Sequence, residues 1–459
     1  GLRMLTLLAA LGVIAAMYAL GRVCDRRVGG AIAGAIFVYL ALGYKIGVPA
    51  ANGEQILLPL VAWSSVSLAH AVRSEDAARK RRLSFIAGLL LGLAGWTKIT
   101  FLVGIAPLAL WSWISSDAGP DGSRARVRAL VPLVLGWLAP GLFVLGVYGI
   151  AGAWDDLVYR FFTYNSDVYM APYADASLAR AILHWFDGPP HERPVALSWL
   201  VAMLALAGYL GFLLAALRRG ELRRTLLRTD VVAITLALAT LGFASGIAEM
   251  RFWNHHFAAA VPWVGLLAGL AVDELASRAR PWLRTAVQVV ALGACVVVLL
   301  ETVGAKAWDR ELERRRGAWE RSSHEPLCKV IHRYAGPRDP IFVWGFDGDL
   351  YVSCAREPAS RYVYTTLVAG IVPPFWHEPR SDRVARDAPR DTALDLEHAK
   401  PPLIVDVPDS IGGTSIHDIP ELEAIVARDY CRRETATGWR GRKATFYGRR
   451  DRGWCDERR

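Results

Sequence analysis

Long apolar runs constrain this chain more than any other feature of its sequence. Ten runs of 15 to 23 residues contain almost no charged side chain, and a helix of about 20 apolar residues crosses a hydrocarbon core about 30 Å thick. The sequence therefore predicts a mostly α-helical, polytopic transmembrane bundle rather than a secreted globule, a fibre or a disordered chain. The predicted spans are 2–20, 28–48, 54–72, 83–97, 99–115, 129–151, 195–217, 231–248, 256–276 and 284–303.

Most of the net charge of +10 arises in this apolar part of the chain. Residues 1–303 hold 26 Lys and Arg against 18 Asp and Glu, whereas residues 304–459 hold 27 against 25. Cation-rich connections alternate with cation-poor ones, which is the pattern that orients membrane proteins with positive loops in the cytoplasm. Because orientation accounts for the charge, we expect no nucleic-acid partner. The cation-rich connections are 21–28, 73–82, 116–128, 218–229 and 277–284.

This orientation predicts two domains, a transmembrane domain of residues 1–303 and a C-terminal domain of residues 304–459 on the outer side. The apolar stretch 83–115 has basic flanks at both ends and must cross twice, so Lys98 is expected at an outer turn formed by residues 96–100. The chain starts at Gly1 directly with a span, without the charged leader of a signal peptide. We therefore expect an earlier span and outer loop upstream.

Polar groups are expected at the outer ends of the spans, because mid-depth positions are almost free of charge. An ion-driven transporter usually has ionisable groups or broken helices near the midplane. The pattern favours an enzyme that acts on a lipid head group at the outer surface. A transporter or flippase of a lipid-linked sugar is the alternative, and a membrane scaffold whose C-terminal domain binds a partner is a third possibility.

Two short outer connections contain candidate site residues. Asn52 and Glu54 precede and open the span 54–72, where they serve either as a helix cap with a dipole-stabilising carboxylate or as an acceptor contact and a catalytic or metal-binding carboxylate. Lys98 is the only charge of its turn, between Thr97 and Thr100. Its ammonium group either extends to water or binds a phosphate oxyanion.

The segment EMRFWNHHF (249–257) is the third outer cluster. Its aromatic residues are typical of an interfacial belt, which accounts less well for Arg251, Asn254, His255 and His256. Arginine binds phosphate with two parallel hydrogen bonds, and histidine can hydrogen-bond phosphate or a leaving group. Adjacent histidines do not have the spacing of a zinc motif. We therefore predict donor-phosphate binding by Arg251, His255 and His256, and an acceptor or sugar contact by Asn254.

The long outer loop 152–194 opens with apolar residues at helical spacing, with Asp155, Asp156 and Arg160 between them. This pattern predicts an amphipathic helix in the membrane interface. Tyr164 and Asn165 follow, and they are candidates for contacts with an acceptor or a sugar. Interfacial tyrosines are also common without such a role, and both interpretations stay open.

The C-terminal region has a soluble composition and predicts a small α/β domain. Helices are expected at 308–335, 347–355 (capped by Asp347) and 420–430, strands at 340–346, 359–365 and 401–407, and a hairpin at 431–449. The Asp-Gly-Asp sequence at 347–349 resembles a metal-binding motif of soluble sugar-nucleotide transferases, although a helix cap explains it more simply.

Four of the six cysteines fall in this outer domain, where an oxidising compartment permits disulfides. Four cysteines allow three pairings, and the sequence does not select one. Our preference is Cys328 with Cys354 and Cys431 with Cys455.

Several segments together resemble a known family. NGEQILLPLVAWSSVSLAHAV, GLLLGLAGWTKITFLVGIAPLALW and RFWNHHFAAAVPWVGLLAGLA resemble bacterial multispanning glycosyltransferases of the GT-C superfamily. They are most similar to the group of dolichyl-phosphate-mannose protein mannosyltransferases and the lipid A aminoarabinose transferase (family 39). VWGFDGDLYVSCAREPASRY and PPLIVDV are similar to the periplasmic C-terminal domain of such proteins.

The resemblance implies a bacterial inner-membrane enzyme that transfers a sugar, with inversion, from a polyprenyl-phosphate donor to a lipid, glycan or protein acceptor at the periplasmic face. The resemblance implies no certain cofactor, and it does not decide whether the enzyme requires a divalent metal. Glu54 matches the acidic residue of the family's second outer loop, and Lys98 matches the lysine of its Gly-rich hairpin. Arg251 and His255 match the basic segment before a span that contains proline, here Pro262.

The family's first outer loop, with its principal Asp, has no counterpart in this sequence. The resemblance therefore implies that residues 1–459 alone are inactive or nearly so. If the base lies within them, Glu54 is the first candidate, followed by Asp155 and Asp156.

Overall fold

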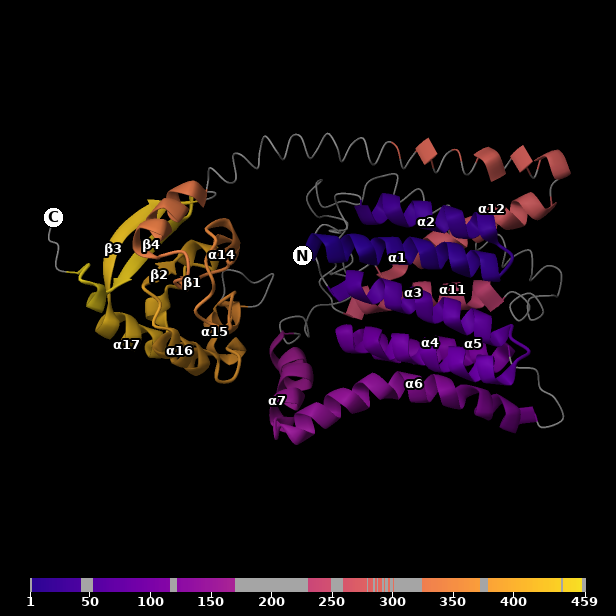
Figure 1. The fold of residues 1–459 in the computed structure, drawn as a ribbon, viewed down its shortest axis with the longest axis horizontal. Coiled ribbons are helices and arrows are strands. Elements are labelled where there is room, and N and C mark those ends of the chain that lie inside the picture. Colours follow the sequence, from indigo (N-terminus) through magenta and orange to yellow (C-terminus); the bar gives the residue numbers. More distant parts are fainter. Residues whose placement is uncertain are drawn as a thin grey trace. The chain divides into compact units, whose positions relative to one another are not determined.

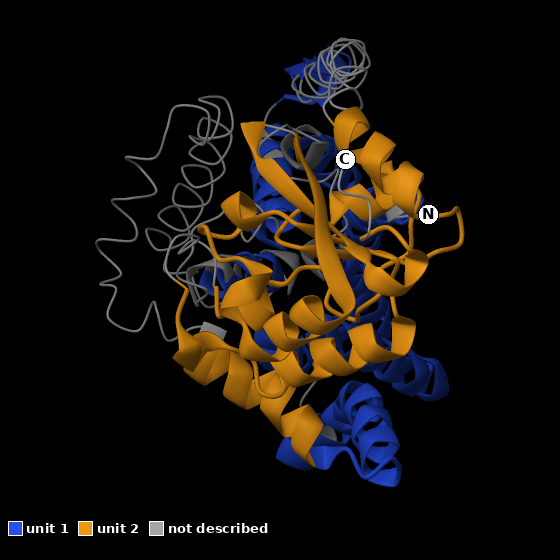
Figure 2. Cartoon of the chain, turned by 90° about the vertical axis from the view of Figure 1, so that its left-hand side faces the viewer, with its two compact units in different colours: residues 1–154, 175–306 blue, residues 155–174, 307–459 orange. Residues whose placement is uncertain are grey.

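The structure is a computed structural model, and it divides the chain into two compact units that are described separately (Figures 1 and 2). One unit comprises residues 1–154 and 175–306, and the other comprises residues 155–174 and 307–459. The described residues are 2–42, 53–115, 122–169, 230–248, 259–278, 324–371, 379–438 and 441–455, with part of 280–300.

The first unit is a bundle of α-helices, as the apolar runs predict. Its described helices are α1 (Leu2–Val23), α2 (Arg27–Leu42), α3 (Gly53–Val72), α4 (Ala77–Thr97), the 3₁₀ helix η1 (Ile99–Gly104), α5 (Ile105–Ser115), α6 (Gly122–Ile150), α11 (Asp230–Ala248) and α12 (Val261–Arg278). The predicted span 195–217 lies outside the described residues.

Glycines let the helices of this bundle approach closely. A Cβ atom on Gly88 of α4 would lie 1.9 Å from the carbonyl oxygen of Leu133 in α6, and one on Gly136 of α6 would lie 2.1 Å from that of Phe85. Gly269 of α12 is equally close to α2, where a Cβ atom would lie 2.2 Å from the carbonyl oxygen of Gly29. In a membrane, lipid tails are as apolar as the side chains, so the hydrophobic effect does not drive helices together. Helices there associate by close packing, and small residues at the contact permit it.

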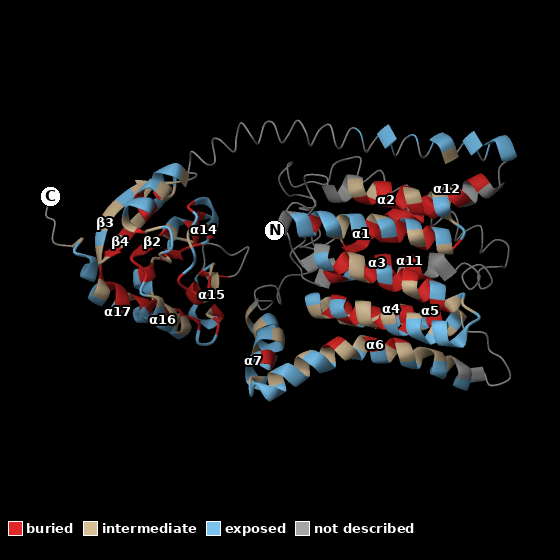
Figure 3. Ribbon diagram, viewed as in Figure 1, coloured by how far each residue is buried: buried red, intermediate tan, exposed pale blue. Residues whose placement is uncertain are grey.

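The helices bury one side and expose apolar side chains on the other (Figure 3). On α6, Leu142 and Phe143 are 62% and 73% exposed, which is expected of a face turned to hydrocarbon. Two described helices are long and apolar enough to cross a membrane, Met4–Val23 and Arg126–Ile150. Shorter apolar helices occur at Arg27–Val38, Ile56–Val72, Ile99–Ser115 and Val261–Asp273, and the total of ten spans stays a prediction.

The predicted turn around Lys98 is present. α4 ends at Thr97, and η1 and α5 fold back along it. A Cβ atom on Gly95 would lie 2.6 Å from the side chain of Leu102, and one on Gly104 would lie 3.2 Å from that of Leu91. Contacts that run in opposite directions along the chain are those of an antiparallel hairpin, so Lys98 occupies its tip.

The second unit contains a four-stranded mixed sheet in the order β1-β2-β4-β3. β1 (Phe342–Trp344) pairs in parallel with β2 (Leu403–Asp406), and β4 (Lys443–Arg449) pairs antiparallel with both β2 and β3 (Tyr430–Thr437). The burial pattern of β1 and β2 shows no exposed position, so both strands lie in the core. The helices of this unit include residues 324–334, α14 (Asp349–Ser353), α15 (Thr366–Ala369), α16 (Ala388–Ala399) and α17 (Pro420–Asp429).

Both disulfides have the pairing that we preferred from the sequence. Cys328 is bonded to Cys354, and Cys431 is bonded to Cys455. The first joins the helix at 324–334 to the end of α14, and the second joins β3 to the residues after β4. Each bond therefore closes a short loop around the edge of the sheet.

Two local predictions in this unit are wrong. Asp347 does not cap α14, whose N-cap is Gly348 without a side-chain bond; its carboxylate instead pairs with Arg442, with an N–O distance of 3.0 Å. Residues 359–365 form no strand. Side-chain hydrogen bonds hold this stretch, instead of backbone hydrogen bonds to a neighbouring strand. Within it, Thr365 accepts from the backbone N–H of Gly345 at 2.8 Å, and the hydroxyl of Tyr362 donates to Asp391 at 3.4 Å.

Residues 155–174, in the loop after α6, belong to the second unit, which differs from a division at residues 303 and 304. The segment after α6 begins as α7 (Trp154–Val158) and continues as a π-helix, η2 (Tyr159–Tyr169). The predicted amphipathic helix is present, but part of its apolar surface packs on protein. Tyr164 contacts a core cluster of the second unit that includes Phe342 and Tyr362.

Candidate functional site

One end of the helical unit holds two of the predicted site positions, the start of α3 and the turn after α4. α3 and α4 are antiparallel neighbours joined by a short turn, so the start of α3 and the end of α4 lie at the same end of the bundle. α6 runs parallel to α4, since Gly92 contacts Pro140 and Gly141 contacts Trp96. Glu54, at the start of α3, and Lys98, just after α4, are therefore on the same side of the bundle by topology.

Lys98 is held at this end by the hairpin itself. Its backbone N–H donates to the carbonyl of Ala94 at 3.0 Å as the last bond of α4, and its own carbonyl accepts from Phe101 at 2.9 Å as the first bond of η1. The residue adopts extended dihedrals, with φ −147° and ψ 110°, between two helical stretches. Its side chain is half-buried, a position from which an ammonium group can meet an anion at the membrane boundary.

The end of α11 lies against the same hairpin. The hydroxyl of Thr100, two residues after Lys98, is 2.7 Å from the hydroxyl of Ser245, three residues before the end of α11. A Cβ atom on Gly242 of α11 would also lie 2.6 Å from the backbone nitrogen of Ala260, next to the start of α12. The end of α11 thus packs on the Lys98 turn, and the residues just before α12 pack on α11.

Several predicted site residues lie outside the described residues, namely Asn52, Arg251, Asn254, His255 and His256. The backbone of Glu54 is described, as the second residue of α3, but its side chain is not. The structure therefore describes only the helix ends from which these residues continue, at the start of α3 and the end of α11. Thr100 and Ser245 were missed from the sequence, because two isolated hydroxyl residues 145 positions apart give no signal of their contact.

Tyr164 and Asn165, the proposed sugar contacts of the outer loop, are engaged within the second unit. The ring of Tyr164 meets that of Tyr159 edge to face, with centroids 6.1 Å apart. The side-chain amide of Asn165 donates to the carbonyls of Arg160 and Phe161 at 3.2 and 3.0 Å. These contacts account for both residues as parts of a folded helix, and a role in sugar binding stays a prediction.

The Asp-Gly-Asp sequence does not form a metal centre with other described residues. Within the described ranges, no three His, Cys, Asp or Glu side chains are placed to hold a metal. Asp347 pairs with Arg442, and Asp349 lies 3.5 Å from the ring nitrogen of His324. Burial raises the pKa of Asp347, and the nearby Arg442 guanidinium opposes this shift.

A second polar group, not anticipated from the sequence, lies at the end of β2. Asp406 is 3% exposed and accepts from the hydroxyl of Ser415 at 2.8 Å. His417 follows, with one ring nitrogen 2.8 Å from the hydroxyl of Tyr447 and the other bonded to Glu423. Burial raises the pKa of Asp406 to about 6, although its hydrogen bonds to Ser415 and the Ile416 backbone favour the ionised form.

Comparison with protein-family models gives no match, and comparison with curated proteins gives none either. Among solved structures, the chain is similar to the crystal structure of ArnT from Cupriavidus metallidurans bound to undecaprenyl phosphate. Sequence identity is 16% and the TM-score is 0.49, over 97% of this chain and 83% of that chain. For ArnT in the apo state the identity is 15% and the TM-score 0.44, with the same coverage. Values this low carry no functional argument.

Proposed function

We propose that this protein is a membrane glycosyltransferase that transfers a sugar from a polyprenyl-phosphate donor to an acceptor at the periplasmic face of the bacterial inner membrane. The observation that carries the proposal is the contact between Thr100 and Ser245. It places the end of α11, from which the Arg251 to His256 segment continues, beside the turn that holds Lys98. Cations from two distant parts of the sequence would then meet one phosphate.

The chemistry requires a base, an acceptor and a stabilised leaving group. A hydroxyl of the acceptor attacks the anomeric carbon of the sugar from the side opposite the phosphate, and the bond between that carbon and the phosphate oxygen breaks. The polyprenyl phosphate leaves with the bonding electron pair, and its developing charge is stabilised by Lys98, Arg251, His255 and His256. The proton of the acceptor passes to a carboxylate acting as general base.

Glu54 is the first candidate for this base among residues 1–459. It opens α3 at the end of the bundle that holds the Lys98 turn. Asp156 is a weaker candidate because its carboxylate lies 3.8 Å from the guanidinium of Arg386 in the second unit. Asp155 is the other candidate, and its side chain is exposed in α7.

Dependence on a divalent metal is tested by adding a chelator to the assay described next.

The test is a donor-turnover assay in lipid nanodiscs with a panel of polyprenyl-phosphate sugars, on residues 1–459 together with any native upstream sequence and in a preparation that shows wild-type turnover. Removal of a preorganised oxyanion donor typically lowers turnover about 10² to 10³-fold, so Lys98→Ala should lose about 10²-fold. Lys80→Ala is the matched control, because Lys80 lies near the opposite end of the same helix. Equal turnover of the two variants would refute the assignment of Lys98.

The assay also separates the other possibilities. Movement of the lipid-linked sugar across the bilayer without cleavage of its phosphate bond would establish a transporter. Comparison of residues 1–459 with a chain that carries any native upstream sequence locates the base. Equal turnover of the two chains would place it within residues 1–459, and Glu54→Gln would then be the next variant.

A further inference from the structure

The segment that follows α6 packs one face against the C-terminal unit. Leu157 is 2% exposed, and Phe161 and Tyr164 are half-buried, at helical spacing along α7 and η2. η2 packs on the short helix η5 (Ser381–Arg383), and Tyr164 contacts the core cluster that contains Tyr362. A five-residue helix and an 11-residue π-helix are too short to be stable alone in water. The segment therefore depends on what it packs against.

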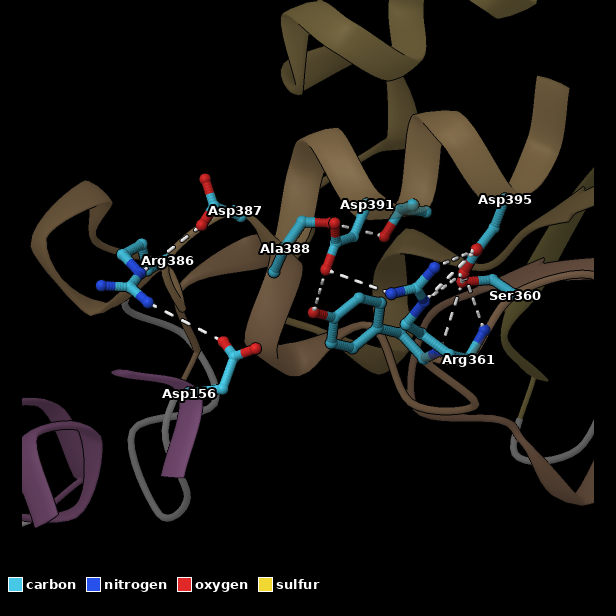
Figure 4. A network of polar contacts seen from close by, with 10 residues as sticks. Asp156, Ser360, Arg361, Arg386, Asp387, Ala388, Asp391 and Asp395 are labelled. Carbon is cyan, nitrogen blue, oxygen red and sulfur yellow. Dashed lines mark hydrogen bonds and ion pairs between the residues drawn. The ribbon is translucent and has the colours of Figure 1, made fainter. Parts of the chain in front are cut away.

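Arg386 makes the polar contacts of this packing (Figure 4). Its backbone N–H donates to the hydroxyl of Tyr159 at 2.5 Å, and its guanidinium lies 4.6 Å from the centroid of the same ring. The guanidinium also lies 3.8 Å from the carboxylate of Asp156. One residue thus engages the segment by a hydrogen bond, a cation–π contact and an ion pair, across 227 positions of the sequence.

The surface that presents Arg386 is built independently of the segment. Asp387 adopts a left-handed conformation with φ 63°, which is uncommon outside glycine and costs free energy. Its carbonyl accepts from Asp391 at 2.7 Å at the start of α16. Arg361 fixes the same helix by binding Asp395, with N–O distances of 2.8 and 3.0 Å (Figure 4). The turn at 384–388 is therefore held in one conformation.

The opposite face of the segment is an exposed apolar stripe. Trp154, Val158 and Phe162, each four residues apart, are 50%, 38% and 55% exposed. Only residues 151–153 separate Trp154 from the end of α6, so the two ends are at most about 14 Å apart along the chain. α6 is a candidate membrane span, and its last residue, Ile150, is 92% exposed. Trp154 thus follows closely on a candidate membrane span, and tryptophan is enriched at membrane–water interfaces.

We propose that residues 154–169 form an adaptor that anchors the C-terminal unit to the membrane surface. Its inner face docks on the turn at 384–388 and α16 through Arg386, and its outer stripe of Trp154, Val158 and Phe162 inserts among lipid acyl chains. Arg386 is the positioning residue of this adaptor. The proposal does not depend on the chemistry that the protein performs.

Hydrogen exchange of the full chain in nanodiscs tests the docked face. Arg386→Ala should raise the exchange of peptides 155–169 and 379–388 about tenfold, which corresponds to about 1.4 kcal/mol. Arg390→Ala is the matched control, since Arg390 is exposed in the first turn of α16 and should leave exchange unchanged. Asp156→Ala removes the carboxylate that pairs with Arg386 and should also raise the exchange of both peptides. It replaces Arg386→Ala if that variant does not fold.

Photolabelling by a diazirine-bearing phospholipid in the same nanodiscs tests the outer stripe. Adducts are expected on residues 154–162 as on 143–150, and not on α16, where Leu394 is equally exposed at 50%. Trp154→Ser with Phe162→Ser should remove most adducts from the segment. Labelled 143–150 with unlabelled 154–162 would overturn the proposal. So would equal exchange in the Arg386→Ala and Arg390→Ala proteins.

Discussion

Replacement of Asp406 by asparagine is expected to stabilise the C-terminal unit at neutral pH. The Asp406 side chain is 3% exposed at the end of β2, between Trp344 of β1 and Thr445 of β4. One carboxylate oxygen accepts from Ser415, and the other, Oδ1, has no hydrogen-bond partner among the described residues. A buried carboxylate with half of its acceptors unused is costly to ionise.

The size of the effect follows from the pKa of this group. Burial raises the pKa of Asp406 from 3.8 to about 6, and each unit corresponds to about 1.4 kcal/mol. Since the folded state holds the proton more tightly than the unfolded state, this stabilising contribution is complete below about pH 4 and is lost as the pH rises through 6. The wild-type unit should thereby lose about 2 kcal/mol between pH 4.5 and 7.5, a loss that Asp406→Asn lacks.

Pulse proteolysis in urea measures this difference on the full chain in detergent. Samples are equilibrated at each pH, and the protease-resistant C-terminal unit is followed through a C-terminal tag. Asp382→Asn is the control, because Arg380 lowers the pKa of that exposed carboxyl and any effect has the opposite sign. Parallel stability profiles for wild type and Asp406→Asn from pH 4.5 to 7.5 would refute the reasoning.

Two further predictions concern packing and covalent closure. Gly88→Ala should lower the thermal midpoint of the helical unit by the equivalent of about 2 kcal/mol, because its Cβ would lie 1.9 Å from a carbonyl of α6. Gly146→Ala, where a Cβ meets nothing within 4 Å, should not lower it in the same melting experiment. Replacing Cys328 and Cys354 by serine opens a loop of 26 residues and should cost the C-terminal unit about 3 kcal/mol in urea. An unchanged urea midpoint would show that this disulfide does not limit stability.

The helical unit and the Lys98 turn were predictable because their signals are local. Run length predicts each helix, and the basic flanks of 83–115 require two crossings, so a turn near 96–100 follows from composition and spacing alone. The strands at 340–346 and 401–407, the helix at 420–430 and the hairpin at 431–449 also carry their patterns within a few residues. The preferred disulfide pairing joined cysteines that are close in sequence, at separations of 26 and 24.

Errors occurred where a distant residue decides the role of a local one. Asp347 has the sequence context of a helix cap, but Arg442, 95 positions later, binds its carboxylate. Residues 359–365 have the composition of a strand, yet Thr365 and Tyr362 tie them to Gly345 and Asp391 instead of to a neighbouring strand. The hydrogen-bond partner of a polar side chain depends on which groups the folded chain places beside it. The local pattern of apolar and polar residues does not predict that partner.

In the segment after α6, residue order predicts some features and only the tertiary structure determines others. Its amphipathic pattern, from Trp154 to Phe162, is a property of residue order and was read from the sequence. Only the tertiary structure decides that Leu157 and Tyr164 turn toward protein while Trp154 and Phe162 remain exposed. Arg386, 227 positions away, hydrogen-bonds Tyr159 of the same segment. Residue order determines which side chains share a helical face, whereas the surface that covers the face exists only after the rest of the chain has folded.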